Sequence, residues 1–131
     1  MISKQKNNFS VLIVDDEKNV CEMIEAFLVM TGLFSSIVIS NDINDAIRKL
    51  SNQEFDLLVV DNMLPGEQEG LDLIERILSY KSKKYPKFIL ISAGLRTKHV
   101  TRAIQLGIRN ILTKPFGKSS FIEKVQDALK L

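Results

Sequence analysis

The strongest constraint on the fold is an alternation of short apolar runs with helical patterns. Five runs predict strands, at residues 11–14, 37–40, 56–60, 88–92 and 110–113. Each run is nearly all apolar, which is typical of parallel strands buried on both faces. The segments between and after them repeat apolar residues every three or four positions, which predicts amphipathic helices. The sequence therefore predicts an α/β fold, a five-stranded parallel sheet doubly wound by five βα units, with helices on both faces.

Glycine and proline positions predict where helices end. Gly32 and Gly107 follow the first and fourth helical patterns and suit the left-handed position after a helix. Pro86 bars the third helix from running into the fourth strand. No linker or repeat indicates a second domain, so we expect an N-terminal extension over residues 1–10 and one domain over residues 11–131.

Composition favours a globular domain that is not bound to a membrane. The chain has 131 residues, of which 45% are hydrophobic and 26% charged. The first ten residues lack the apolar centre of a signal peptide, and no eighteen apolar residues run together. We expect a cytoplasmic location. The single cysteine, Cys21, cannot form an internal disulfide and lies at helical spacing among apolar residues, which favours packing over reactivity.

Polar residues end or follow four of the predicted strands. Residues 15–17 (DDE) follow the first, Asp61 follows the third, Ser92 ends the fourth and Lys114 follows the fifth. In doubly wound sheets, ligands bind beyond the carboxyl ends of the strands, near the switch point in strand order. We therefore expect these side chains to meet at one edge of the sheet.

Clustered carboxylates repel one another, and a hard divalent cation such as Mg²⁺ relieves that repulsion. An aspartate beside the metal can attack a phosphoryl group, while an ammonium and a hydroxyl contact the phosphoryl oxygens. Simpler roles exist for each residue. Asp61 could be a turn former, Asp15 or Asp16 a helix cap, and Lys114 a solvated lysine. A cap requires only one acid, however, and explains neither Asp61 nor Lys114.

Four separated motifs resemble the receiver domain of two-component response regulators, over about residues 11–131. The motifs are VLIVDDE (11–17), DNMLP (61–65), ISA (91–93) and LTKPF (112–116). The resemblance implies a flavodoxin-like receiver fold and a phosphoacceptor domain of a two-component phosphorelay. A sensor histidine kinase or a phosphotransfer protein would be the phosphohistidine donor.

The resemblance also implies a role for each site residue. Asp61 would accept the phosphoryl group, Ser92 would be the switch hydroxyl and Lys114 would contact the phosphoryl group. The ligands of Mg²⁺ would be Asp15, Asp16, Asp61 and the backbone carbonyl of Met63.

The chain departs from the usual family pattern at several positions. Ile111 stands where an aromatic residue is usual, and the loop over residues 66–69 is one residue longer. The resemblance implies that Met63 and Gly94 flank the path of attack on the phosphoryl group, and neither offers a side-chain amide or carboxylate to orient water. We therefore expect a switch with slow self-dephosphorylation rather than an enzyme. His99 has no second histidine or cysteine at ligand spacing, which predicts a surface position on the fourth helix.

Charge is distributed unevenly along the chain. Residues 1–80 hold 6 Lys and Arg against 14 Asp and Glu, whereas residues 81–131 hold 12 against 2. In receivers, the fourth helix, fifth strand and fifth helix commonly form the signalling face. Here that face is predicted to carry Lys98, Arg102, Arg109, Lys118 and Lys124. We expect it to bind an acidic output protein or domain rather than a second copy. Direct nucleic acid binding is disfavoured because no aromatic residues interleave with these bases.

Three other functions remain as alternatives. The first, supported by Ile111, is a receiver-like interaction module that works without phosphorylation. A Mg²⁺-dependent phosphohydrolase with its nucleophile on the first strand would need a second Asp two positions on, where Glu17 stands. An FMN carrier is weaker still, because the loop after the first strand is acidic where a flavin phosphate needs hydroxyl and amide groups.

Overall fold

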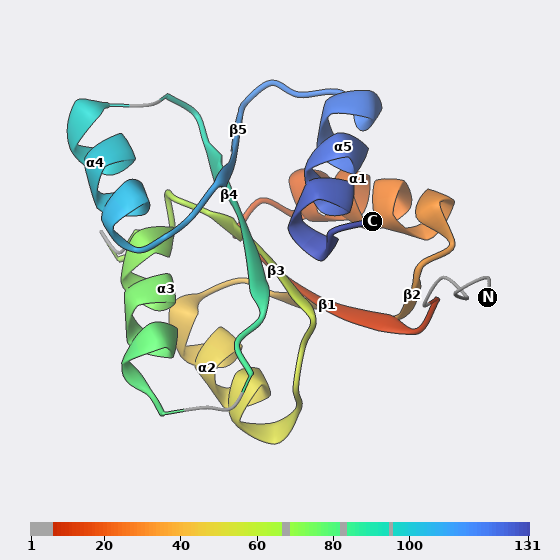
Figure 1. The fold of residues 1–131 in the computed structure, drawn as a ribbon, viewed down its shortest axis with the longest axis horizontal. Coiled ribbons are helices and arrows are strands. Elements are labelled where there is room, and N and C mark those ends of the chain that lie inside the picture. Colours follow the sequence, from red (N-terminus) through yellow and green to blue (C-terminus); the bar gives the residue numbers. More distant parts are fainter. Residues whose placement is uncertain (1–6, 67–68, 82–83, 95) are drawn as a thin grey trace.

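The computed structural model describes residues 7–66, 69–81, 84–94 and 96–131, in which strands and helices alternate (Figure 1). In chain order the elements are β1 (Phe9–Val14), α1 (Lys18–Thr31), β2 (Phe34–Ser40), α2 (Ile43–Asn52), β3 (Leu57–Asp61), α3 (Gly70–Ser79), β4 (Lys87–Ser92), α4 (Thr97–Gln105), β5 (Asn110–Thr113) and α5 (Lys118–Leu129).

The sheet is parallel, with the strand order β2-β1-β3-β4-β5. The chain moves outward from β1 to β2, returns across β1 to β3, and then continues through β4 to β5. The direction of winding therefore reverses between β1 and β3, where Val14 pairs with Val60. This arrangement confirms the predicted doubly wound fold and places the ligand-binding switch point beside the ends of β1 and β3.

Helices cover both faces of the sheet, with α1 and α5 on one face and α2, α3 and α4 on the other (Figure 1). Successive residues of β1 alternate between the two layers. Leu12 and Val14 pack towards α2 and α3, whereas Val11 and Ile13 pack towards α1 and α5. The strand is apolar throughout because each of its faces meets a core.

The prediction of strands buried on both faces holds for β1, β3 and β4 but is wrong for the edge strands. In β2 only Ser40 is buried, and in β5 only Leu112. Both strands pair on one side only, so their side chains stay closer to solvent. β1 and β2 also start earlier than predicted, because the rings of Phe9 and Phe34 pack together with centroids 6.1 Å apart.

The predicted glycine positions are confirmed. Gly32 (φ 68°) and Gly107 (φ 79°) both adopt positive φ, and the Gly32 N–H donates to the Val29 carbonyl at the end of α1. α3 already ends at Ser79, so Pro86 does not itself terminate that helix. Among the described residues, none of the helices combines the length and apolar content needed to cross a bilayer.

Candidate functional site

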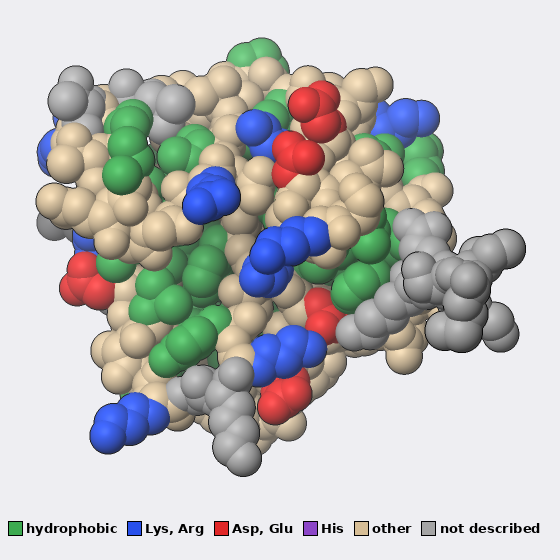
Figure 2. All heavy atoms as spheres, in the orientation of Figure 1, with side chains coloured by type: hydrophobic (Ala, Val, Ile, Leu, Met, Phe, Trp, Pro, Cys, Tyr) green, Lys and Arg blue, Asp and Glu red, His purple; other side chains and the backbone are tan. Residues whose placement is uncertain are grey.

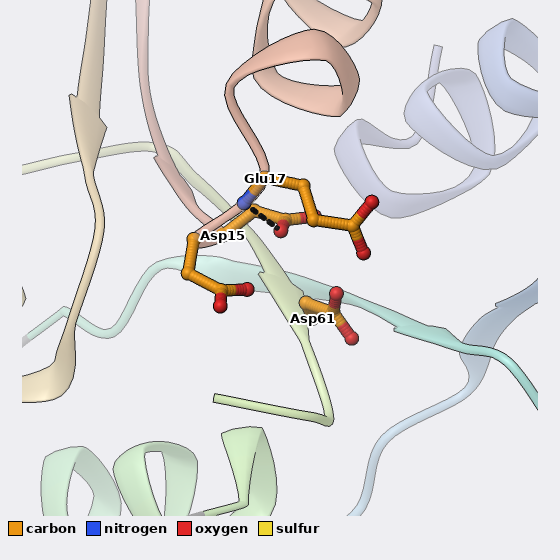
Figure 3. Close-up of side chains that lie close together, drawn as sticks. Asp15, Glu17 and Asp61 are labelled. Atoms are coloured by element: carbon orange, nitrogen blue, oxygen red, sulfur yellow. Dashed lines mark hydrogen bonds between the residues drawn. The ribbon is translucent and has the colours of Figure 1, made fainter. Parts of the chain in front are cut away.

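Four acidic side chains gather at the carboxyl ends of β1 and β3 (Figure 3). Asp15 follows β1 and Asp61 ends β3, and their side chains are 1% and 2% exposed. Asp16 and Glu17 are exposed beside them. One carboxylate oxygen from each residue lies within 4.8 Å of those of the others. The neighbouring strands β1 and β3 thus bring together acids that are 46 positions apart in the sequence.

Backbone N–H groups orient the two buried carboxylates. The Glu17 N–H donates to Asp15 Oδ1 at 2.9 Å, and the Met63 N–H donates to Asp61 Oδ1 at 2.9 Å. Asp61 is therefore also a turn former, because its side chain bonds an N–H two residues on. The turn leaves Asp61 Oδ2 available to other partners.

Lys114 lies between the acids. Its Nζ is 2.6 Å from Asp61 Oδ2, 3.4 Å from Glu17 Oε1 and 3.8 Å from Asp15 Oδ2. Although burial opposes the charge, the hydrogen bond to Asp61 and the nearby Asp15 raise the pKa of Lys114. The ammonium therefore stays protonated and partly neutralises the buried acids.

The Asp15 carboxylate remains incompletely compensated. Its Oδ2 has no hydrogen-bond partner in the described part of the chain. Burial raises the pKa of Asp15 to about 6, and the charge of Asp61 raises it too, against the lowering effects of the Glu17 N–H and Lys114. A buried oxygen without a partner, beside further carboxylates, fits a hard divalent cation with oxygen ligands.

Ser92 and Met63 lie at the same edge. Ser92 is 3% exposed, and its carbonyl accepts the Lys114 N–H at 2.8 Å. Its hydroxyl donates to the Gly94 carbonyl at 2.6 Å, so it is engaged with its own loop. The backbone of Met63 forms a bridge with Glu69, and the Met63 side chain is 65% exposed.

Two sequence predictions on α4 are wrong. His99 does not occupy a solvated surface position, because its side chain is only 13% exposed and its Nε2 lies 3.0 Å from Glu69 Oε1. Arg102 does not belong to a free basic face, because its guanidinium contacts three acids at the N-cap and within the neighbouring helix α3. These contacts form the α3–α4 charge cluster, which consists of Glu69, Asp72, Glu75, His99 and Arg102.

This cluster was not predicted from the sequence, although a signal was present. The three acids recur every three positions, as do His99 and Arg102, and such spacing aligns side chains on one helix face. Of the other predicted bases, Lys98, Arg109 and Lys118 are exposed and Lys124 is half-buried. Figure 2 shows Lys and Arg side chains spread over the face that carries β5 and α5, with Asp and Glu among them. This face is therefore not uniformly positive.

Two departures from the usual family pattern remain, Ile111 and the longer loop over residues 66–69. Ile111 is half-buried and packs against the core layer below α2 and α3. The longer loop includes residues 67 and 68, which lie outside the described residues.

Sequence comparisons agree with this geometry. The family model described as "Response regulator receiver domain" matches residues 11–126. Chemotaxis protein CheY-3 of Vibrio cholerae is 29% identical over 118 residues, covering 90% of this chain and 89% of CheY-3. Protein PetR of Rhodobacter capsulatus is 29% identical over 120 residues. That match covers 92% of this chain but only 48% of PetR, so the chain spans about half of that relative.

Solved structures show the same fold. A putative response regulator from Chloroflexus aurantiacus superposes with a TM-score of 0.83 at 24% identity, covering 95% of this chain and 99% of that one. The chemotaxis response regulator CheY4 of Vibrio cholerae gives a TM-score of 0.82 at 20% identity, covering 93% and 99%. With the acid cluster, Lys114 and the match over residues 11–126 in agreement, the chain belongs to the response regulator receiver domain family of two-component signalling.

Proposed function

We propose that Asp61 accepts a phosphoryl group from the phosphohistidine of a histidine kinase or phosphotransfer protein, in a reaction that requires Mg²⁺. One observation carries the proposal: the buried Asp61 Oδ2 lies 2.6 Å from Lys114 Nζ, beside an Asp15 oxygen that lacks a hydrogen-bond partner among the described residues. Charge compensation is thus concentrated where a phosphoryl group would be received.

In the transfer, an Asp61 oxygen forms a bond to phosphorus while the P–N bond to the donor imidazole breaks, and the imidazole leaves with that electron pair. The Met63 N–H holds Oδ1 and so fixes the orientation of the carboxylate. Lys114 Nζ exchanges its contact with Asp61 Oδ2 for the phosphoryl oxygens. Ser92 reaches the phosphoryl group only if its hydroxyl leaves the Gly94 carbonyl.

Asp15, Asp16, Asp61 and the Met63 carbonyl would hold the metal. Magnesium supplies charge neutralisation for the carboxylates and the phosphoryl oxygens when it is bound. The main support is the buried Oδ2 of Asp15, which has no hydrogen-bond partner among the described residues.

Incubation with acetyl phosphate and Mg²⁺ is expected to add the mass of one phosphoryl group to the protein, because the small donor supplies the same group as a phosphohistidine. Intact-protein mass spectrometry measures the gain. Asp61→Asn and excess EDTA should each abolish it. A gain that survives either treatment contradicts the assignment, and no gain at all in the unmodified protein favours the phosphorylation-independent interaction module.

The raised pKa of Asp15 predicts the pH dependence of stability without metal. Because the folded state holds the Asp15 proton up to about pH 6 and the ordinary value is 3.8, the free energy of unfolding in EDTA should fall as pH rises between these values. Asp15→Asn should remove this loss and stabilise the metal-free protein by about 1–2 kcal/mol at pH 7.

Urea unfolding in EDTA and in Mg²⁺ checks this expectation. Mg²⁺ should stabilise the unmodified protein more than Asp15→Asn, which lacks a ligand. Asp16→Asn is the matched control, since Asp16 is exposed and should change the metal-free stability little. An Asp15→Asn protein less stable than the unmodified protein in EDTA would show that burial of the Asp15 charge and its repulsion by Asp61 do not destabilise the metal-free site.

We further propose that the chain is a switch with slow self-dephosphorylation rather than a turnover enzyme. Met63 and Gly94 have no side-chain amide or carboxylate to orient an attacking water. Both positions accept larger polar side chains, because Met63 is 65% exposed and a Cβ at Gly94 would meet nothing within 4 Å.

Met63→Asn or Gly94→Glu should shorten the lifetime of the phosphorylated protein about tenfold by positioning water. The decay of the phosphoryl mass after removal of the donor measures the lifetime. Met30→Asn, at an exposed methionine on α1, is the matched control and should leave the decay unchanged. Equal decay in all variants would remove the support for this role of Met63 and Gly94.

The output face is proposed to bind an acidic protein surface through Lys98, Arg109, Lys118 and Lys124. Its support is the excess of bases beyond residue 80, with Arg102 now excluded because α3 neutralises it. Two such faces would repel each other across a symmetric interface. We therefore expect a monomer in sedimentation of the beryllofluoride-treated protein at both low and moderate salt. A dimer at low salt that Arg109→Glu abolishes would show that the face pairs with itself.

A further inference from the structure

Helix α4 is attached to the rest of the domain by little apolar packing. Among its described side chains, only Ala103 is buried, while Ile104 is 67% exposed. By contrast, α5 buries Phe121, Val125 and Ala128. Because apolar burial supplies most of the attachment of a surface helix, polar contacts must contribute an unusually large share for α4.

Those polar contacts are made by the α3–α4 charge cluster. His99 Nε2 lies 3.0 Å from Glu69 Oε1, and Arg102 Nη1 lies 3.2 Å from Glu69 Oε2. Arg102 Nη2 lies 2.8 Å from Asp72 Oδ1 and 3.3 Å from Glu75 Oε2. The Arg102 and Glu69 side chains are each 28% exposed, so solvent screens these contacts less than it screens a fully exposed pair.

Local charge supports the same arrangement. Burial disfavours the charged forms of Asp72 and Arg102. The Glu69 N–H and Arg102 nevertheless lower the pKa of Asp72. Likewise, Asp72 and Glu75 raise the pKa of Arg102. His99 Nδ1 is buried without a hydrogen-bond partner in the described residues, so Glu69 is the partner that holds the ring.

Glu69 also belongs to the segment that carries the phosphoacceptor. Its backbone forms a bridge with Met63, whose N–H donates to Asp61 Oδ1. The next residue, Gly70, donates its N–H to the Asn62 carbonyl at 3.0 Å. A Cβ at Gly70 would lie 2.4 Å from the Asp61 carbonyl oxygen, so the start of α3 presses directly on the backbone of Asp61. Glu69, which contacts His99 and Arg102 of α4, is therefore connected to the proposed phosphorylation site at Asp61 through one residue, Met63.

We propose that His99 and Arg102 are positioning residues that hold the start of α3 against the Asp61 backbone, and that the α3–α4 charge cluster transmits the state of Asp61 to α4. The transmission part rests on the proposed phosphorylation of Asp61, whereas the positioning part does not. Modification of Asp61 moves Met63 and Glu69. This movement changes the position of the Glu69 carboxylate, which both His99 and Arg102 contact. Since α4 has little other attachment, its position responds to that change.

Hydrogen exchange of the unphosphorylated protein tests the positioning role. Arg102→Gln and Glu69→Gln should each speed exchange at the Met63 and Gly70 amides about threefold or more, and the double variant should add little to either single change. Lys87→Gln is the charge-matched control, because Lys87 is an exposed base at the start of β4, and it should leave these amides unchanged. Unchanged exchange at Met63 and Gly70 in both single variants overturns the positioning role.

The same proteins with acetyl phosphate and Mg²⁺ test transmission. Phosphorylation should change the exchange of α4 amides in the unmodified protein and in Lys87→Gln, and this response should fall by about half or more in Arg102→Gln although the phosphoryl mass is still gained. A full α4 response in phosphorylated Arg102→Gln, or none in the phosphorylated unmodified protein, overturns transmission through the cluster. Failure of the unmodified protein to gain phosphoryl mass would instead refute the proposed function and, with it, transmission, while the first experiment still decides the positioning role.

Discussion

The repulsion between the buried carboxylates of Asp15 and Asp61, bridged by one ammonium, is the interaction on which the site depends. The parallel pairing of β1 with β3 brings the two acids together. Lys114 follows β5 and extends its ammonium between them. Two negative charges that water barely reaches oppose folding. The apolar layers on both faces of the sheet offset this cost, so the stability of the core permits a cluster of acids at the edge of the sheet.

The fold was accessible from the sequence because its signals are local. The apolar runs, the glycines after α1 and α4 and the polar residues at strand ends each act within a few positions. The position of Asp61 at the edge of the sheet could be predicted because it follows an apolar run. In a parallel sheet the residues that end neighbouring strands lie at the same edge. Beginnings of strands were harder to predict. Phe9 and Phe34 extend β1 and β2 through a contact between two strands, which neither segment reveals by itself.

The α3–α4 charge cluster was missed for a different reason. Whether His99 and Arg102 face solvent or another helix depends on how α4 is rotated about its axis. The apolar pattern of α4 is short and includes Ile104, which is 67% exposed, so this pattern defines the rotation poorly. Their acidic partners lie about 30 positions earlier, at the N-cap and within α3. Likewise, the sequence identified Ser92 as a site residue, but the direction of its hydroxyl is decided by the Gly94 carbonyl in the adjacent turn.

Cys21 acquires chemical meaning from its place beneath the acid cluster. Its side chain is 2% exposed and its thiol donates to the Asp15 carbonyl at 3.4 Å. Burial and the charges of Asp15, Asp16 and Asp61 raise the pKa of this thiol to about 11, so almost none of it is thiolate at neutral pH. Alkylating reagents therefore reach a reactive sulfur only when α1 separates from the sheet. The sole cysteine of the chain is therefore a native reporter of how often α1 moves away from the acid cluster, without any introduced label.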